Sequence, residues 1–591
     1  MRGAVRSVVV AVAVAAVVAA GAAPGAFAQA PAPNVPEGAS GRADRAPVTS
    51  RRFMIAAANP HAVDAGYAIL ARGGSAVDAA IAAQLVLNLV EPQSSGIGGG
   101  AFMLVHDAKR QRLIAYDGRE TAPAAATPGR FLDRDGKPLA FREAVIGGHS
   151  VGVPGTVALL EAVHRAHGRL PWAELFAPAI ALSRNGFAVS PRLHALLAAE
   201  RLLDGPRAHA YFYAGPGRPH PVGHVLKNPA FARTLAAIAA GGAKAFYEGE
   251  IAQDVVDTAN LHPTNRGDLA LADLAAYRVV VREPVCGAYR GYRVCGMPPP
   301  SSGGIAVLQM LAFLEPFDVA AMGPASFWSV HFMSEAGRLA FADRGAYVAD
   351  PAFAPPPAGL LDPAYLAARG ALISPRSTLG RASPGDPPAR LPARRRQAAT
   401  AADAIELPST SHLSVVDGDG NAVAMTTSIE DAFGSRQMTA GGFLLNNQMT
   451  DFSFAPEVDG RPVANRIEPG KRPRSSMAPT VVYDRNGRVF MVAGSALGAN
   501  IINFVAKTLL GVVDWKLDPQ AAVALPNFGS TNGPTELERG TAVAGLAPKL
   551  AALGHDVQVV ERASGTQVIV RTPQGWIGGA DPRREGTVRG E

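Results

Sequence analysis

A hydroxyl-rich segment at residues 409–412, Ser-Thr-Ser-His, is the first place where the sequence suggests chemistry. It stands at the head of a predicted strand. A hydroxyl group there can attack the carbonyl that precedes it, and hydrolysis of the resulting ester would leave Thr410 at a new N-terminus. The α-amine of Thr410, with an ordinary pKa near ~8, would then serve as general base to its own hydroxyl. Ser409 and Thr410 are therefore the predicted processing site, with Thr410 the predicted nucleophile.

Strand pairing brings further polar side chains beside Thr410. Two predicted strands follow it, at residues 411–416 and 422–429, joined by the turn at residues 417–421. This turn sets a register that places Thr410 opposite Ser428. Because side chains alternate along a strand, Ser428 and Glu430 are expected on one face, next to the nucleophile.

Other patterns with chemical meaning are weaker. Gly148 to Gly152 (Gly-His-Ser-Val-Gly) matches the nucleophile elbow of α/β-hydrolases, but residues 141–146 make a poor buried strand and Pro154 would disturb the following helix. The glycines at 96–100 lack the spacing of a phosphate loop and favour tight backbone packing near a site. The 13 histidines include no His-x-x-His or His-Glu-x-x-His spacing. The sequence therefore predicts neither a metal nor a cofactor.

The elements that must position these residues fall into a helix-rich first part and a strand-rich second part. Residues 375–404, rich in Pro, Ala, Arg and Ser, are the predicted mobile linker between the two parts. We expect helices over residues 60–70, 76–90, 156–166, 171–183 and 501–513, and strands over 101–105, 279–285, 292–295, 411–416, 422–429, 480–483, 489–493 and 557–560.

The composition is that of a folded protein of two or three lobes. The chain has 591 residues, of which 48% are hydrophobic and 18% charged, which excludes a disordered tail protein. The net charge of +7 comes mainly from scattered arginines, with one run at residues 390–396. No aromatic-interleaved basic motif accompanies that run, so we expect a solvated surface and no nucleic-acid partner.

The first residues are typical of an export signal. Arg2 and Arg6 precede the apolar run Val8 to Ala20, and Ala26 to Ala28 offer a small-x-small cleavage site. A mature chain beginning at Gln29 is expected, periplasmic or secreted, with no membrane anchor after signal cleavage. The alternative is an uncleaved anchor, although the apolar run is shorter than the ~20 residues of a spanning helix.

The two cysteines of the chain are placed for a bridge. If Arg290 and Gly291 form the turn of a hairpin, Cys286 lies directly opposite Cys295. Such cross-strand neighbours can form a disulfide, which an exported protein would retain. Two free buried thiols are the alternative.

A string of motifs over nearly the whole expected mature chain resembles the γ-glutamyltranspeptidase family. One shared motif can arise by chance, but this number of motifs in this order cannot. The motifs are Asn59-Pro60, Gly73-Gly74, Ala76 to Ala80, Ser95 to Gly100, Asp117 to Pro123, Val151 to Gly155, Leu170 to Trp172, Pro298 to Gly304, Thr410 to His412, Leu444 to Met449, Lys471 to Pro473 and Ser475 to Met477.

The resemblance implies an α+β fold, the four-layer αββα sandwich of N-terminal-nucleophile hydrolases. It further implies one precursor that cuts itself before Thr410 into a large, helix-rich subunit (residues 29–409) and a small, strand-rich subunit (410–591), which stay associated. The implied activity takes a γ-glutamyl group from glutathione or related compounds and transfers it to water, an amino acid or a peptide through a threonyl acyl-enzyme. No metal or organic cofactor is implied.

The resemblance also assigns roles to matched residues. Arg119 offers a bidentate fork to the substrate α-carboxylate, helped by the hydroxyls of Ser475 and Ser476. Asp451 and Gln448 suit the α-ammonium, and holding both charged groups would place the γ-carbonyl at Thr410. The remaining implied site residues are Ser428, Leu497 and Gly498 as catalytic residues, and Glu430 and Asn447 as substrate-binding or orienting residues.

Three positions depart from the family pattern. The paired glycines that present oxyanion-hole amides correspond to Leu497 and Gly498, and leucine disfavours a positive φ and would narrow the pocket. Glu430 replaces a frequent Asn, and Asn500 stands where many members carry Arg. Residues 454–470 are a candidate lid.

These departures keep two alternatives open. One is a glutaryl acylase of the same fold, such as a cephalosporin acylase, although a glutaryl chain has no ammonium for Asp451 and Gln448. The other is an unprocessed periplasmic relative that only binds amino acids or peptides.

Overall fold

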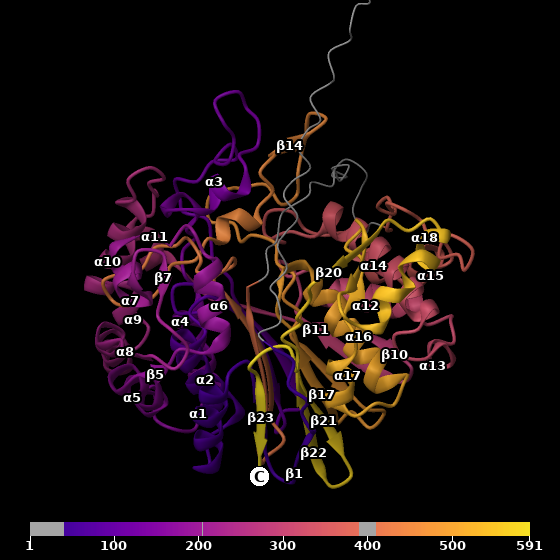
Figure 1. Ribbon diagram of the computed structural model, residues 1–591, viewed down its shortest axis with the longest axis horizontal. Helices are drawn as coiled ribbons and strands as arrows, with labels where there is room; N and C mark the ends of the chain where they lie inside the picture. The colour runs from indigo at the N-terminus through magenta and orange to yellow at the C-terminus, as the bar shows by residue number, and fades with distance from the viewer. Residues whose placement is uncertain (1–40, 204, 389–408) are drawn as a thin grey trace, which may run out of the picture. The chain divides into compact units, whose positions relative to one another are not determined.

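Two seven-stranded sheets lie face to face, and helices cover the outer side of each sheet (Figure 1). This is the arrangement in the computed structural model, which describes residues 41–203, 205–388 and 409–591. The four layers confirm the predicted αββα sandwich. The predicted signal peptide, the first residues of the expected mature chain and residues 389–408 lie outside the described residues.

Sheet 1 carries the predicted nucleophile strand at its centre. Its order is β23-β2-β12-β13-β3-β4-β9. The strands are β23 (Thr587–Gly590), β2 (Met54–Ala57), β12 (Ser411–Val416), β13 (Ala422–Ser428), β3 (Gly100–Asp107), β4 (Arg112–Gly118) and β9 (Val280–Arg282). Every adjacent pair in this sheet is antiparallel.

Side-chain alternation in sheet 1 decides which groups face the second sheet. Leu413 and Val415 of β12 pack among the outer helices, whereas Val416 and, from β13, Ala422 and Ala424 pack toward sheet 2. Even-numbered residues of both strands therefore point inward.

Sheet 2 has the order β1-β22-β21-β17-β16-β11-β10. Its strands are β1 (Val48–Ser50), β22 (Gly575–Ala580), β21 (Gln567–Thr572), β17 (Val489–Gly494), β16 (Thr480–Tyr483), β11 (Tyr292–Gly296) and β10 (Val285–Tyr289). The shorter strands outside the two sheets are β5 (Phe187–Ala188), β6 (Tyr213–Gly215), β7 (Arg218–Pro219), β8 (Val225–Leu226), β14 (Glu457–Val458), β15 (Arg461–Pro462), β18 (Phe528–Gly529), β19 (Thr535–Glu538) and β20 (Val557–Val560).

Two helical layers complete the sandwich, on opposite sides in Figure 1. The layer on sheet 1 contains α1 (Pro60–Ala71), α2 (Ala76–Val90), α4 (Thr156–His167), α5 (Ala177–Asn185), α6 (Pro191–Ala199), α7 (Pro206–Phe212), α8 (Pro229–Gly241), α9 (Lys244–Tyr247), α10 (Gly249–Asn260) and α11 (Leu271–Ala276). The layer on sheet 2 contains α12 (Gly303–Leu314), α13 (Val319–Met322), α14 (Phe327–Tyr347), α15 (Pro363–Gly370), α16 (Ile501–Val513), α17 (Pro519–Ala524) and α18 (Ala547–Ala552). The short helix α3 (Phe141–Val145) belongs to a separate small cluster.

The first two helices start where local sequence predicts. The Asn59 side chain accepts the backbone N–H of His61 before α1, and Pro60 occupies the first turn. Ser75 and Asp78 form a reciprocal capping box at α2. All residues of α2 are buried, so this helix is the centre of the layer on sheet 1.

The predicted cysteine hairpin is present, with one correction. Cys286 pairs directly with Cys295 across β10 and β11, and the two are joined by a disulfide. The single strand predicted over residues 279–285 is wrong. This range contains β9, which pairs with β4 in sheet 1, and the first residue of β10, which belongs to sheet 2. Pro284, which has no backbone N–H, lies between them, so the chain crosses from one sheet to the other there.

The mobile linker predicted over residues 375–404 starts too early in the chain, because residues 378–385 are bonded to the folded core. The backbone N–H groups of Thr378, Ala382 and Gly385 donate to groups of the folded core at 2.9, 2.8 and 2.9 Å, so this segment lies against the protein. Residues 389–404 lie outside the described residues. The helix predicted over 171–183 is a 3₁₀ turn, Trp172–Phe176, followed by α5.

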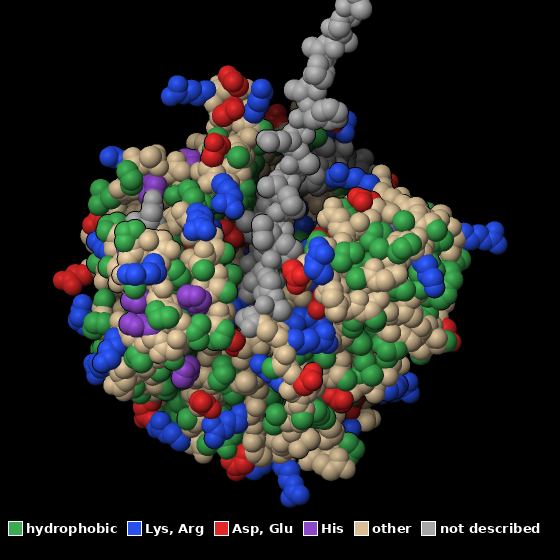
Figure 2. All heavy atoms as spheres, in the orientation of Figure 1, with side chains coloured by type: hydrophobic (Ala, Val, Ile, Leu, Met, Phe, Trp, Pro, Cys, Tyr) green, Lys and Arg blue, Asp and Glu red, His purple; other side chains and the backbone are tan. Residues whose placement is uncertain are grey.

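Charged side chains of both signs are interspersed over the face shown in Figure 2. Within the three described ranges, no helix combines the length and apolar character needed to cross a membrane.

Candidate active site

A cavity between the two sheets gathers most of the predicted site residues. Of the residues predicted for catalysis, substrate binding or processing, all but Leu497 and Asn447 line it. The lining residues are Arg119, Ser409, Thr410, Ser428, Glu430, Gln448, Asp451, Ser475, Ser476, Met477, Gly498 and Ile501. Met477 and Ile501, the first residue of α16, supply the apolar part of the wall. The sequence analysis did not assign these two residues to the site.

One part of the cavity wall consists of three hydroxyl-bearing residues around a peptide bond. Thr410 Oγ1 contacts the carbonyl oxygen of Ser409 and lies 3.3 Å from Ser428 Oγ. Ser428 Oγ in turn donates to that carbonyl oxygen at 3.1 Å and accepts the N–H of Glu430 at 2.9 Å. The predicted register therefore places Thr410 beside Ser428, and a hydroxyl donor beside the carbonyl that Thr410 would attack.

The glycine run at 96–100 makes room for this part of the site. A Cβ on Gly98 would lie 2.1 Å from the carbonyl oxygen of Leu444, and a Cβ on Gly99 would lie 2.2 Å from that of Ser428. Only glycine allows the backbone to approach this closely. The run therefore allows tight backbone packing near the site, as predicted.

Buried charges line a second part of the cavity wall, which we call the charged end. The Arg119 guanidinium forms an ion pair with Asp451 and donates to the carbonyl oxygens of Pro473 and Arg474. Arg119 is 1% exposed and Asp451 is 5% exposed. Gln448 Nε2 donates to the same Asp451 carboxylate at 2.7 Å. A cation and an anion thus stand side by side, which suits a ligand carrying both charges.

A second buried carboxyl group, that of Glu120, lies next to the Arg119 guanidinium. Glu120 is fully buried, 3.7 Å from the guanidinium, and neither of its oxygens has a hydrogen-bond partner within the described part of the chain. Burial raises the pKa of Glu120 to about 8, although Arg119 opposes that shift. Near neutral pH the Glu120 carboxyl is therefore largely protonated. The positive charge of Arg119 then remains available to Asp451 and to a bound carboxylate.

Asn447 acts on Glu430 from outside the cavity wall. Its Nδ2 donates to the Glu430 carboxylate, and its Oδ1 accepts the N–H of Asp431 at 3.0 Å. Thr450 Oγ1 also contacts Glu430, at 3.4 Å. Asn447 thus orients the Glu430 side chain.

Arg344 is a residue of the site's support that the sequence analysis missed. This α14 residue donates to Ser476 Oγ and to Ser302 Oγ, both at 2.8 Å. Ser475 Oγ accepts the N–H of Met477 at 3.1 Å. The two serine hydroxyls are therefore fixed at the charged end. Arg344 carried no distinguishing signal in the sequence, because α14 also contains the buried charged residues Glu335, Arg338 and Asp343.

Residues 62–590 match the sequence profile of the family described as Gamma-glutamyltranspeptidase. The chain belongs to this family. The glutathione hydrolase proenzyme of Escherichia coli (strain K12) is 37% identical over 576 residues, covering 94% of this chain and 95% of that protein. The glutathione hydrolase proenzyme of Bacillus subtilis (strain 168) is 36% identical over 507 residues, covering 85% of this chain and 84% of that protein. The crystal structure of a cephalosporin acylase from Bacillus halodurans superposes with a TM-score of 0.80 at 28% identity, covering 93% of this chain and 97% of that one. The sandwich is thus the N-terminal-nucleophile hydrolase fold.

The loop at Leu497 departs from the γ-glutamyltranspeptidase pattern, and the structure shows how it accommodates a leucine. Leu497 adopts a left-handed conformation with φ of 85°, followed by Gly498 with φ of 57°. The Leu497 side chain packs with Ala496, Phe504 and Ala563. Gly498 lines the cavity and Leu497 does not, so the expected narrowing of the pocket by the leucine is not seen.

Of the other two departures, Glu430 lines the cavity and Asn500 lies outside its wall. Asn500 Nδ2 donates to Glu536 at 3.1 Å, and Asn500 Oδ1 accepts from Asn503 at 3.0 Å. The candidate lid, residues 454–470, packs through Phe454 against Phe131, with ring centroids 4.6 Å apart. No residue of this segment lines the cavity as described.

The Gly148–Gly152 motif does not form a nucleophile elbow in the structure. Ser150 Oγ is buried and donates to the carbonyls of Val145 and Gly147, and α4 begins only at Thr156, so the elbow is not formed.

Away from the cavity, His331, Glu335 and His555 form a buried group that the search for histidine spacings missed. His331 Nδ1 lies 2.8 Å from His555 Nε2, and their other ring nitrogens contact Ser374 O and Thr535 Oγ1. This group is a hydrogen-bonded network in which the two imidazoles are already partnered.

The left-handed conformation of Leu497 yields a stability prediction. Replacing Leu497 by Ala removes buried apolar contacts and keeps the strain of a positive φ, so the free energy of unfolding should fall by about 2 kcal/mol. Replacement by Gly removes the same contacts but relieves the strain, and should cost about 1 kcal/mol less than replacement by Ala. Urea unfolding of both variants measures the difference. A Gly variant less stable than the Ala variant would contradict the left-handed assignment.

Proposed function

We propose that this chain is the exported precursor of a γ-glutamyltransferase and glutathione hydrolase that cuts itself between Ser409 and Thr410. The observation that carries the proposal is that Thr410 and the buried Arg119–Asp451 pair line the same cavity. Family membership supports the reaction class. The glutathione hydrolase relatives support the γ-glutamyl group as the group transferred.

Self-cleavage begins with an N-to-O acyl shift. Thr410 Oγ1 attacks the Ser409 carbonyl carbon, and Ser428 donates a hydrogen bond to the developing oxyanion. The C–N bond breaks, the Thr410 nitrogen takes the proton released by its hydroxyl, and an ester joins Ser409 to Thr410. Water then hydrolyses the ester and leaves a Ser409 carboxylate and a free Thr410 amine and hydroxyl.

The freed amine makes Thr410 the nucleophile for turnover. The α-amine takes the hydroxyl proton as Oγ1 attacks the substrate γ-carbonyl, and the leaving amine of the donor departs with that proton. The acyl-enzyme is released by water or by the amine of an amino acid or peptide. The backbone N–H of Gly498, which lines the cavity, is the proposed oxyanion donor, with the N–H of Leu497 beside it.

Substrate recognition is proposed at the charged end. The α-carboxylate would bind Arg119 with the hydroxyls of Ser475 and Ser476, and the α-ammonium would bind Asp451 with Gln448 and Glu430. Fixing both groups sets the distance to the γ-carbonyl, so acyl groups without an amino-acid end would be positioned poorly.

Sheet topology explains how two subunits would stay together after the cut. In sheet 1, β12 of the small part lies between β2 of the large part and β13, and β13 in turn pairs with β3 of the large part. The proposed subunits, residues 29–409 and 410–591, therefore share hydrogen-bonded sheets. The Cys286–Cys295 disulfide suits a periplasmic or secreted protein, which is the proposed location.

Thr410→Ala should abolish both cleavage and turnover, because it removes the attacking oxygen. A γ-glutamyl anilide assay is expected to show turnover by the native enzyme and at least a 10³-fold smaller kcat/KM for the variant, on the order expected for loss of a covalent nucleophile. Turnover that survives in Thr410→Ala would rule out Thr410 as nucleophile. An unprocessed binding protein would show no turnover in either form.

The acylase relative motivates a glutaryl acylase as second candidate, and Asp451 separates the two. The native enzyme should release a γ-glutamyl anilide faster than a glutaryl anilide. Asp451→Asn should lower kcat/KM for the γ-glutamyl compound by about 10–100-fold, the worth of a hydrogen bond to a charged group, and change the glutaryl rate much less. Faster glutaryl release by the native enzyme would favour the acylase.

A further inference from the structure

The loop at residues 91–95, which follows α2, contacts the residues on both sides of Thr410. Ser409 Oγ donates to the carbonyl oxygen of Gln93, and Ser411 Oγ donates to Glu91 Oε2 at 2.7 Å. All of these side chains are buried. The loop therefore fixes the chain immediately before and after the residue that would attack.

The same loop also holds the strand that carries Ser428. The carbonyl oxygen of Ser94 accepts the N–H of Ile429 at 3.2 Å, and that of Gln93 accepts the N–H of Phe433 at 3.1 Å. The distance between the two hydroxyl-bearing strand ends is thus set by one short segment of the large part.

Arg192 completes this arrangement from α6. Its Nη1 donates to Glu91 Oε1 at 2.6 Å, and its Nη2 donates to Ser94 Oγ at 3.0 Å. Glu91 is 0% and Arg192 is 2% exposed. A buried ion pair is retained only where further hydrogen bonds offset the loss of water, and here Glu91 also accepts from Ser411.

We propose that the Glu91–Arg192 pair is a positioning element for self-cleavage, which holds Ser411 so that Thr410 Oγ1 faces the Ser409 carbonyl. The inference rests on the proposed function, since it assumes that Thr410 cuts the chain. A peptide bond resists attack unless the nucleophile is held in a near-attack geometry, and fixing the neighbouring residues supplies that constraint. No motif in the sequence analysis included Glu91 or Arg192.

Glu91 also gives the cleavage step a pH signature. Burial raises the pKa of Glu91 above its ordinary value, opposed by Arg192, Arg584 and the Ser411 hydrogen bond and reinforced by Glu585. As pH falls, Glu91 therefore protonates earlier than an ordinary glutamate and loses its hold on Arg192. The rate of self-cleavage should fall with it. Glutamine resembles protonated Glu91, since it keeps an acceptor oxygen without a negative charge, and it does not titrate.

Time courses of self-cleavage of freshly purified precursors, from pH 4 to 9, test the proposal. Glu91→Ala and Ser411→Ala should slow cleavage at least tenfold at neutral pH. Glu91→Gln, which like protonated Glu91 offers Arg192 no negative charge, should cleave slowly at neutral pH and should lose the acid decline seen in the native precursor. The matched control is Asp514→Ala, which removes a buried carboxylate that likewise accepts from an arginine and a hydroxyl, Arg290 and Tyr289. Asp514 follows α16 at the end opposite Ile501, about 20 Å along the helix.

The outcomes separate this inference from the proposed function. Slow cleavage in the Glu91→Ala and Ser411→Ala precursors, with a normal rate in Asp514→Ala, supports the positioning role. Cleavage of Glu91→Ala and Ser411→Ala within twofold of the native rate overturns it, as does equal slowing in the Asp514→Ala control. If Thr410→Ala is itself cut, the proposed function fails instead.

Discussion

The antiparallel pairing of β12 with β13 is the interaction on which the rest of the site depends. Its register, with Val416 opposite Ala422, places Thr410 beside Ser428 at the ends of the two strands. A slip of one strand by one residue would turn its hydroxyl toward the helices, so that Thr410 and Ser428 would lie on opposite faces of the sheet. The turn at residues 417–421 resists that slip, since Asp417 accepts the N–H groups of Asp419 and Asn421. The chemistry of the site thus begins with a hairpin turn.

The sandwich gives this hairpin surroundings that hold its polar groups in place. His412, next but one to Thr410, lies between the sheets with Thr426 Oγ1 at 2.8 Å and Ser414 Oγ at 3.0 Å, and burial lowers its pKa to about 3. It is therefore neutral and acts as a fixed hydrogen-bonding group.

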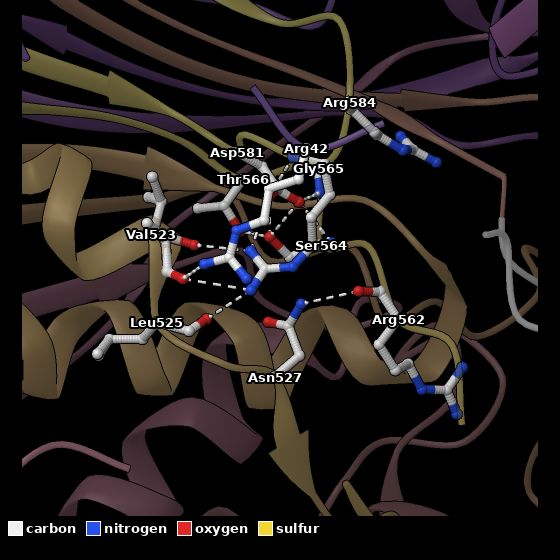
Figure 3. Close-up of polar contacts among 12 residues, drawn as sticks. Arg42, Val523, Leu525, Asn527, Arg562, Ser564, Gly565, Thr566, Asp581 and Arg584 are labelled. Carbon is white, nitrogen blue, oxygen red and sulfur yellow. Dashed lines mark hydrogen bonds and ion pairs between the residues drawn. The ribbon is translucent and has the colours of Figure 1, made fainter. Parts of the chain in front are cut away.

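The C-terminal segment adds a support of its own. Arg584 Nη1 donates to the carbonyl oxygen of Thr410 at 3.1 Å. Figure 3 shows Arg584 extending away from the contacts that Asp581 makes with Ser564 and Gly565. The nucleophile is consequently supported by segments far apart in the sequence.

Local patterns were enough to predict much of the fold. The starts of α1 at residue 60 and of α2 at residue 76, the β12–β13 register and the bounds of α16 follow from short-range rules, and the structure has them. The crossing of the chain between the sheets at Pro284 was missed, because a proline between two short apolar stretches does not reveal which sheet each stretch joins.

Only part of the site was predicted, and that part came mainly from the family resemblance and not from local sequence patterns. Most cavity-lining residues came from the family resemblance, whereas Arg344, Glu91 and Arg192 carry no motif of their own. Their contribution is visible only once helices α14 and α6 are packed against the site. The conformation of Leu497 likewise depends on a hydrophobic cluster assembled from distant segments.

Intact mass with N-terminal sequencing of the purified, exported protein tests the central claim most directly. The account predicts two associated chains, one beginning at Gln29 and the other at Thr410. That result would establish signal removal, self-cleavage and the freed threonine amine together. A single uncut chain that stays intact over days, or a new N-terminus at any residue other than Thr410, would contradict the account.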